Sequence, residues 1–160
     1  MVDGMSAAGF SVTVDEGELV VLAGRLAQQV GDGGVIHMIG DLGAGKTTFA
    51  RALLGAIGVG ERIKSPTYSL IESYMAGDLS VHHLDLYRIA APDELEWLGL
   101  ADLASGRFLL VTEWPERAGR ALPEPDLLVR LAHAGVKRAL QMEAQSARGE
   151  RWLSHLGMAG

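Results

Sequence analysis

Apolar residues recur along this chain with two different periods. In seven short segments they alternate with polar residues or form an unbroken run, which is typical of β-strands. These segments are 10–14, 35–39, 68–74, 79–84, 107–112, 127–131 and 139–143. Turn-forming residues separate the third segment from the fourth at Gly77-Asp78, and the last two at His133-Ala134-Gly135. We therefore expect both pairs to be hairpins.

Elsewhere the apolar residues recur every three or four positions, as they do on one face of a helix. We expect helices in four segments, 15–30, 46–57, 92–98 and 152–156. Asp15 can cap the first helix, because Glu18 follows at the spacing of a capping box. Strands that alternate with helices predict an α/β fold.

The P-loop pattern G-x-x-x-x-G-K-[ST] is matched at every fixed position by residues 40–47, between a predicted strand and a predicted helix. Its glycines let successive N–H groups face phosphate oxygens, and the helix N-terminus adds a partial positive charge. Lys46 can reach the β- and γ-phosphates, and the Thr47 hydroxyl can bind Mg²⁺. We therefore expect ATP or ADP to bind here. The expected nucleotide-binding residues are Asp41, Leu42, Gly43, Ala44, Gly45, Lys46, Thr47 and Thr48.

Two acidic residues at strand ends are candidates to complete this site. Glu113 follows the more apolar strand, so we expect it near Mg²⁺, directly or through water, together with Thr47. Asp85 ends a more polar strand and is expected near the γ-phosphate. The alternative, that either is only a strand-end or helix-cap carboxylate, stays open. Thr67, in Ser65-Pro66-Thr67, is expected to sense the γ-phosphate from a switch-like loop; the alternative is a strand-entry turn.

The histidines and tryptophans are weaker candidates for a functional role than the residues above. His37 lies within the strand before the P-loop and is expected to be packed. His82 and His83 are adjacent in a predicted strand, so they face opposite ways and make a poor metal pair. The three tryptophans are expected to be core or interface residues rather than a stacking platform; they are Trp97, Trp114 and Trp152.

Composition limits the class of protein. The 160 residues suit a single domain, 1–160, in which residues 1–9 are expected to be a flexible tail. The chain has 48% hydrophobic residues, but no apolar run approaches the ~20 residues of a membrane span. No signal segment is apparent either, so we expect a cytoplasmic protein. The absence of cysteine excludes disulfides and thiolate ligands. The net charge of −6, with no basic cluster, predicts that contact with RNA is made through a partner.

Fast hydrolysis by P-loop proteins usually needs an arginine finger, worth ~10³–10⁵ in rate. Arg88, Arg117 and Arg120 are candidate donors, but no pattern fixes any of them at the phosphates. We therefore expect slow hydrolysis by the chain alone and a partner that completes the site.

Five motifs occur in a fixed order: GDLGAGKTTFARALL, SPTYSLIESY, HLDLYR, ELEWLGL and TEWPERAG. Together they resemble the TsaE (YjeE) family, small bacterial ATPases needed for the threonylcarbamoyl-adenosine modification of tRNA. The resemblance covers roughly residues 15–122; beyond Leu122 only length and strand character match. By position it assigns Lys46 and Thr47 to phosphate and metal, Thr67 to the switch-like loop, and Asp85 and Glu113-Trp114 to the later motifs. His83 matches the motif histidine.

The resemblance implies a P-loop NTPase fold, with a mostly parallel central sheet flanked by helices and an antiparallel extension. It also implies ATP or ADP with Mg²⁺, and work in a complex with a TsaD-like threonylcarbamoyl-transferase and a TsaB-like companion. ATP hydrolysis would reset the transferase between turnovers, and tRNA would be met only through the complex.

Two other functions remain open at this point. A small-molecule P-loop kinase has a similar size, but it normally needs an arginine-rich lid, and no arginine-dense insertion is visible. A non-catalytic, nucleotide-gated binding module would bind ATP without releasing phosphate, even with its partners.

Overall fold

The computed structural model describes residues 9–60, 71–89, 91, 93 and 106–156. They form one seven-stranded sheet of order β1-β7-β6-β2-β5-β4-β3. The strands are β1 (Gly9–Val14), β2 (Gly34–Gly40), β3 (Ile71–Ala76), β4 (Leu79–Asp85), β5 (Phe108–Glu113), β6 (Leu127–Ala134) and β7 (Lys137–Ala144). The helices are α1 (Glu16–Ala27), α2 (Lys46–Ile57) and α4 (Ala147–Leu156), with a 3₁₀ turn, η2 (Pro115–Ala118).

The sheet is mixed, with the expected parallel centre and antiparallel strands on both sides of it. Strands β6, β2, β5 and β4 form a parallel centre. Both edges are antiparallel, because β3 pairs with β4, β7 with β6 and β1 with β7. Two tight turns produce the hairpins, at Gly77 (φ 63°) and Gly135 (φ 64°), and such short connections can join only antiparallel strands. The antiparallel extension therefore lies on both sides of the parallel centre.

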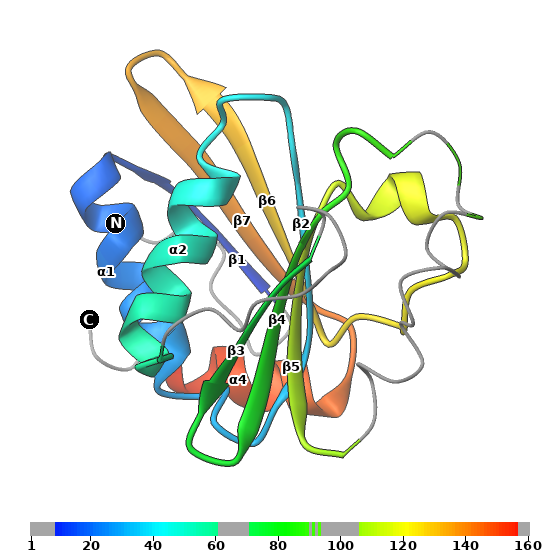
Figure 1. Ribbon diagram of the computed structural model, residues 1–160. Coiled ribbons are helices and arrows are strands. Elements are labelled where there is room, and N and C mark those ends of the chain that lie inside the picture. The colour runs from blue at the N-terminus through cyan, green and yellow to red at the C-terminus, as the bar shows by residue number, and fades with distance from the viewer. Residues whose placement is uncertain (1–8, 61–70, 90, 92, 94–105, 157–160) are drawn as a thin grey trace.

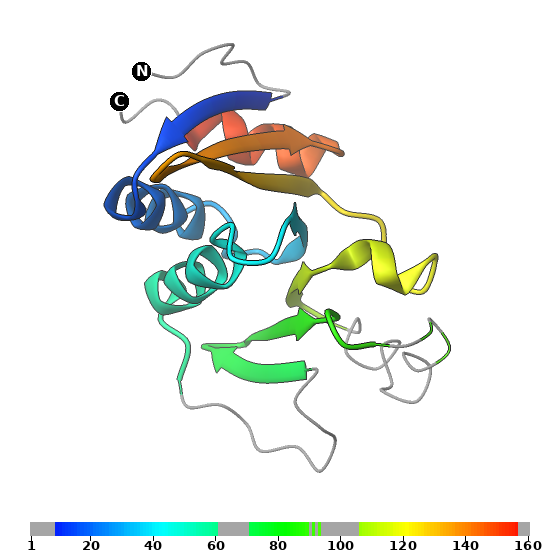
Figure 2. The ribbon, with the colours of Figure 1, turned by 90° about the horizontal axis from the view of Figure 1, so that it is seen from above.

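The main layers are the sheet and the helices that cover one face of it. Figure 2 shows α1 and α2 together on one face and η2 on the other. In Figure 1, α4 crosses the end of the sheet that is opposite the β2–α2 connection. The larger apolar core lies between the sheet and the helices, and a smaller one lies on the opposite face around Leu84, Leu110 and Ala118. None of the described helices is long and apolar enough to cross a membrane.

Most predicted elements of the described ranges are present. The capping box at the start of α1 is confirmed: Glu18 N donates to Asp15 Oδ1 over 2.8 Å, and Asp15 N donates to Glu18 Oε1 over 3.0 Å. Strand β1 begins at Gly9, the last residue of the expected tail. Of the predicted helix at 92–98 only residue 93 is described, and the loop that carries Thr67 lies outside the described residues.

Asp126 joins three elements at the end of the sheet away from the β2–α2 connection. Its Oδ2 accepts the Val35 N–H of β2 over 2.9 Å, and its Oδ1 accepts the Ser146 hydroxyl over 2.6 Å, just before α4. Asp126 N also donates to Val35 O over 2.8 Å. The carboxylate is only 16% exposed, so water has little access to these bonds.

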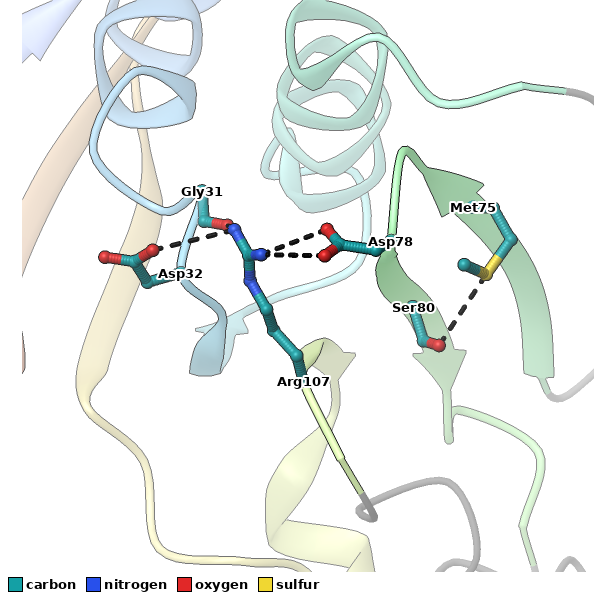
Figure 3. Close-up of polar contacts among 6 residues, drawn as sticks. All are labelled: Gly31, Asp32, Met75, Asp78, Ser80 and Arg107. Carbon is teal, nitrogen blue, oxygen red and sulfur yellow. Dashed lines mark hydrogen bonds and ion pairs between the residues drawn. The ribbon is translucent and has the colours of Figure 1, made fainter.

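Arg107 makes a second connection at this end, but on the surface (Figure 3). Its guanidinium donates to both carboxylate oxygens of Asp78, at 3.0 and 3.2 Å, and to Gly31 O at 2.8 Å. Asp32 lies 3.6 Å away. Because Arg107 and both carboxylates are well exposed, these contacts should contribute little free energy.

We expect loss of the Asp126 connection to destabilise the protein more than loss of the Arg107 connection. Asp126→Ala leaves the buried Val35 N–H without an acceptor, so the free energy of unfolding should fall by about 1–3 kcal/mol. Arg107→Ala removes exposed ion pairs and should cost about 1 kcal/mol or less, and less still in high salt. Urea unfolding of both variants checks this. Equal losses would mean that Asp126 does not hold β2 in the way its bonds indicate.

His37 of β2 is packed, as expected. Burial lowers its pKa from 6.5 to about 4, and its Nε2 has no hydrogen-bond partner among the described residues. Its neighbour across the sheet is Thr112 of β5, whose hydroxyl likewise lacks a described partner. His37 is therefore neutral in the folded protein near neutral pH.

A lowered histidine pKa makes stability depend on pH. Between about pH 6.5 and pH 4 the unfolded chain binds the His37 proton and the folded chain does not, so the free energy of unfolding falls as the pH falls. The full stability is present above about pH 6.5. His37→Leu should flatten this slope in urea unfolding, whereas His155→Leu, at an exposed position of α4, should keep it. An unchanged slope in His37→Leu would contradict the assignment.

Candidate functional site

Residues 40–47, here called the glycine loop, connect β2 to α2 along a path that needs glycine. A Cβ at Gly40 would lie 2.2 Å from Leu131 O of β6, closer than real Cβ atoms come. Gly43 and Gly45 have φ of 79° and 106°, in the left-handed region that other residues rarely adopt. Gly45 also lies against Leu19 of α1. The loop is therefore held close to β6 on one side and to α1 on the other.

The glycine loop ends at the N-terminus of α2, which begins at Lys46. Gly45 precedes it and has no side chain to cap the first turn, and that turn holds no acidic residue. The first N–H groups of a helix lack partners within the helix and carry part of its dipole. This end of α2 is consequently suited to an anion.

Lys46 is only 4% exposed, and its ammonium group contacts the glycine loop itself. Nζ donates to Gly40 O and, over 2.9 Å, to Asp41 O. It also lies 4.2 Å from the centroid of the Trp114 ring, as in a cation–π contact. Burial lowers the pKa of Lys46, and nearby carboxylates, Glu113 foremost, offset part of that effect. Carbonyl groups and a ring face thus surround this cation.

Glu113 ends β5 and faces the start of α2. The Thr47 hydroxyl donates to Oε1 over 2.8 Å, and His83 Nε2 lies 2.6 Å from Oε2. Glu113 is 2% exposed, and burial alone would raise its pKa. Its neighbours outweigh burial and hold this pKa below its usual value: the hydrogen bond and charge of His83, the hydrogen bond of Thr47 and the charge of Lys46. The carboxylate is therefore ionised at neutral pH, with a hydroxyl beside it.

Asp85 ends β4 and is the direct sheet neighbour of Glu113. Its Oδ1 accepts the N–H of Tyr87 over 3.1 Å, as in an Asx turn. The two acids lie together because β4 and β5 are parallel and end at the same edge. Asp85 is less buried than Glu113, so it is the more accessible of the two.

A cavity of about 720 Å³ is lined by the glycine loop and by both acids. Six of the predicted nucleotide-binding residues line it: Leu42, Gly43, Gly45, Lys46, Thr47 and Thr48. Asp41 and Ala44 belong to the loop but do not line the cavity, and Thr67 lies outside the described residues. The structure thus brings together one continuous loop and two acids from distant parts of the sequence.

The cavity also contains residues that the sequence did not single out. Glu16 and Leu19 come from α1, and Val136 and Arg138 come from the tip of the β6–β7 hairpin. The spacing of apolar residues placed them in a helix and a hairpin, but it cannot predict which elements contact the glycine loop. Val136 is 97% exposed, so this hairpin forms the outer rim.

Trp114 was expected to be a core or interface residue, and it also contacts the cavity. It packs partly against the smaller core, but its backbone is left-handed (φ 61°) and its ring lies over Lys46. The Tyr87 ring packs against it, with the centroids 5.1 Å apart and the ring planes tilted by 51°. Arg117 lies 5.3 Å from the centroid of the Tyr87 ring and 5.4 Å from that of Trp114. Arg88 lines the cavity. Trp152 is a core residue, as expected, and Trp97 lies outside the described residues.

The two adjacent histidines face opposite sides of the sheet, as expected. His82 Nδ1 lies 2.8 Å from the Ser73 hydroxyl, whereas His83 contacts Glu113. The contact between His83 and Glu113 was missed. The alternation of His83 with Asp85 on one strand face could have indicated it, because both then face the same side as Glu113.

Comparison with known proteins gives one consistent family. The family model described as "Threonylcarbamoyl adenosine biosynthesis protein TsaE" matches residues 13–141. The "tRNA threonylcarbamoyladenosine biosynthesis protein TsaE" of Haemophilus influenzae is 39% identical over 120 residues, 75% of this chain and 76% of that protein. The protein of the same name from Bacillus subtilis is 35% identical over 123 residues, 77% of each.

A solved structure agrees with this. The crystal structure of Bacillus subtilis YdiB matches 99% of this chain and 97% of its own, with a TM-score of 0.76 and 27% identity. The fold, the motif series and the relatives all lead to one conclusion: this chain belongs to the TsaE family.

Proposed function

We propose that this protein is a cytoplasmic, Mg²⁺-dependent P-loop ATPase that supports formation of N6-threonylcarbamoyladenosine in tRNA. It would act with a TsaD-like threonylcarbamoyl-transferase and a TsaB-like companion. Family membership supports the pathway. The observation that carries the chemistry is the 2.8 Å contact between the Thr47 hydroxyl and Glu113, at the start of α2 and beside Lys46.

The glycine loop would hold the polyphosphate of ATP or ADP. Its positive-φ glycines and the uncapped N-terminus of α2 suit an anion. Lys46 would exchange the carbonyl groups of Gly40 and Asp41 for phosphate oxygens. That exchange replaces neutral carbonyl dipoles by charged phosphate oxygens, which attract the ammonium more strongly.

Thr47 and Glu113 would hold the metal. A hydroxyl beside an ionised carboxylate offers the hard oxygen ligands that Mg²⁺ prefers, and Mg²⁺ is usually held by one or two protein groups together with phosphates. Bound Mg²⁺ neutralises charge that develops on the β- and γ-phosphate oxygens. The donor set in this cavity therefore fits the ion.

Asp85 would orient the attacking water and accept its proton as the bond between the γ-phosphorus and the bridging oxygen breaks. It adjoins Glu113 in the sheet and lines the same cavity. Because Glu113 is already engaged by Thr47 and His83, the less buried Asp85 is better placed to exchange protons with water. The products are ADP and phosphate.

Hydrolysis by the chain alone would be slow. Arg117 lies against two aromatic rings, and Arg88 lines the cavity without a described contact to the glycine loop. A partner would supply or position the missing cation, and the net charge of −6 favours contact with tRNA through that partner. Family membership does not favour the small-molecule kinase alternative.

Phosphate release from ATP tests this proposal. We expect slow release by the purified chain and faster release with the transferase and its companion. Lys46→Ala should weaken ATP binding about 10–100-fold, because it removes a charged donor worth about 1.5–3 kcal/mol. Arg107→Ala, remote from the cavity, is the control. Unchanged ATP binding by Lys46→Ala would refute the P-loop role, and binding without release in the full complex would indicate a nucleotide-gated module.

The roles of the two acids can be separated by isosteric variants. Glu113→Gln should abolish most of the effect of Mg²⁺ on nucleotide affinity. Asp85→Asn should keep that effect but slow phosphate release about 10²–10⁴-fold, as expected for loss of a general base. Calorimetry with and without Mg²⁺, followed by release assays, distinguishes them. If Asp85→Asn alone removes the Mg²⁺ effect, the two assignments must be exchanged.

A further inference from the structure

Three neighbouring strands present a row of side chains that leads to the glycine loop. Glu72 of β3 is the direct partner of His83 in β4, and Asp85, two residues further along β4, is the direct partner of Glu113 in β5. All four therefore lie on the same face of the sheet. Glu72 and His83 are outside the set of residues to which a function has been assigned.

The contacts along this row run from the edge of the sheet to α2. Glu72 Oε1 lies 3.5 Å from His83 Nδ1, and His83 Nε2 lies 2.6 Å from Glu113 Oε2. The other oxygen of Glu113 accepts the Thr47 hydroxyl at 2.8 Å. Each oxygen of Glu113 thus has its own donor, on opposite sides of the carboxylate.

These contacts fix the role of His83. An ionised carboxylate only accepts hydrogen bonds, so the short contact requires the proton on Nε2. The bond occupies Oε2 and leaves Oε1 directed at Thr47. A carboxylate held at both oxygens cannot turn freely, so its orientation is set before any ion binds.

Burial makes the histidine hard to replace by water. His83 is 5% exposed and Glu113 is 2% exposed. If the imidazole were removed, Oε2 would be left in a site with little access to solvent, and the carboxylate would turn toward other donors. His82, equally buried on the same strand, points to the other face and contacts Ser73 instead.

We propose that His83 is a positioning residue for the metal site: it holds the Glu113 carboxylate in the orientation that pairs Oε1 with Thr47. This inference rests on the proposed function, because it assumes that Thr47 and Glu113 bind Mg²⁺. Residues that orient metal ligands typically contribute about 10–100-fold to metal affinity.

The test measures ADP binding by calorimetry at increasing Mg²⁺ concentration, with the full chain. His83→Leu removes the donor and should raise the Mg²⁺ concentration for half-maximal effect about 10–100-fold. Affinity for ADP without Mg²⁺ should stay close to that of the wild type. His83→Gln places an amide N–H near the position of Nε2 and should restore most of the Mg²⁺ response.

His82→Leu is the matched control, because it removes a buried imidazole from the same strand without touching Glu113. It should leave the Mg²⁺ requirement unchanged, and thermal unfolding of all variants shows that they are folded. If His83→Leu keeps the wild-type requirement, or if His83→Gln is as impaired as His83→Leu, the positioning role is wrong. A wild-type chain that binds no ADP, or binds it without regard to Mg²⁺, would instead overturn the proposed function and this inference with it.

Discussion

The parallel pairing of β2 with β5 is the constraint on which the site depends. Met38 of β2 is level with Glu113 of β5, so the chain leaves both strands at the same edge of the sheet. The glycine loop then turns back and begins α2 directly above that edge. As a result Thr47 and Glu113, far apart in the sequence, are one hydrogen bond apart. A one-residue shift in this register would turn Glu113 to the opposite face.

The site holds several charges that are tolerable only as a group. Lys46 and Glu113 are both nearly excluded from solvent, and an isolated charge in such a place would be strongly disfavoured. Each is offset by its neighbours: the ammonium by carbonyl oxygens and nearby carboxylates, and the carboxylate by two donors and the ammonium. Removing one partner from a set of this kind usually costs more than the pair contributes, because the other partner stays buried.

Much of this arrangement follows from local sequence. The capping box of α1, the strand before the glycine loop and the hairpin turns at Gly77 and Gly135 each depend on a few neighbouring residues, and local physics decides them. The order of strands does not follow from local sequence. Pairing between distant segments decides three features that periodicity cannot specify. These are the mixed sheet, the approach of the β6–β7 tip to the cavity and the contact between His83 and Glu113. The contact of the Trp114 ring with Lys46 could not be predicted for the same reason, because it joins two distant parts of the sequence.

The contacts of Lys46 have a consequence for selectivity among anions. Its ammonium already contacts two carbonyl oxygens of its own loop and the face of an indole ring, here called its contact shell. Any anion that binds it must replace most of that shell at once. A single inorganic phosphate would bring charged oxygens for the exchange but no linked groups to fill the rest of the glycine loop. Under the proposed function, a chain of linked phosphates would occupy the helix N-terminus and the ammonium together, so the site would discriminate by the length of its ligand as well as by charge.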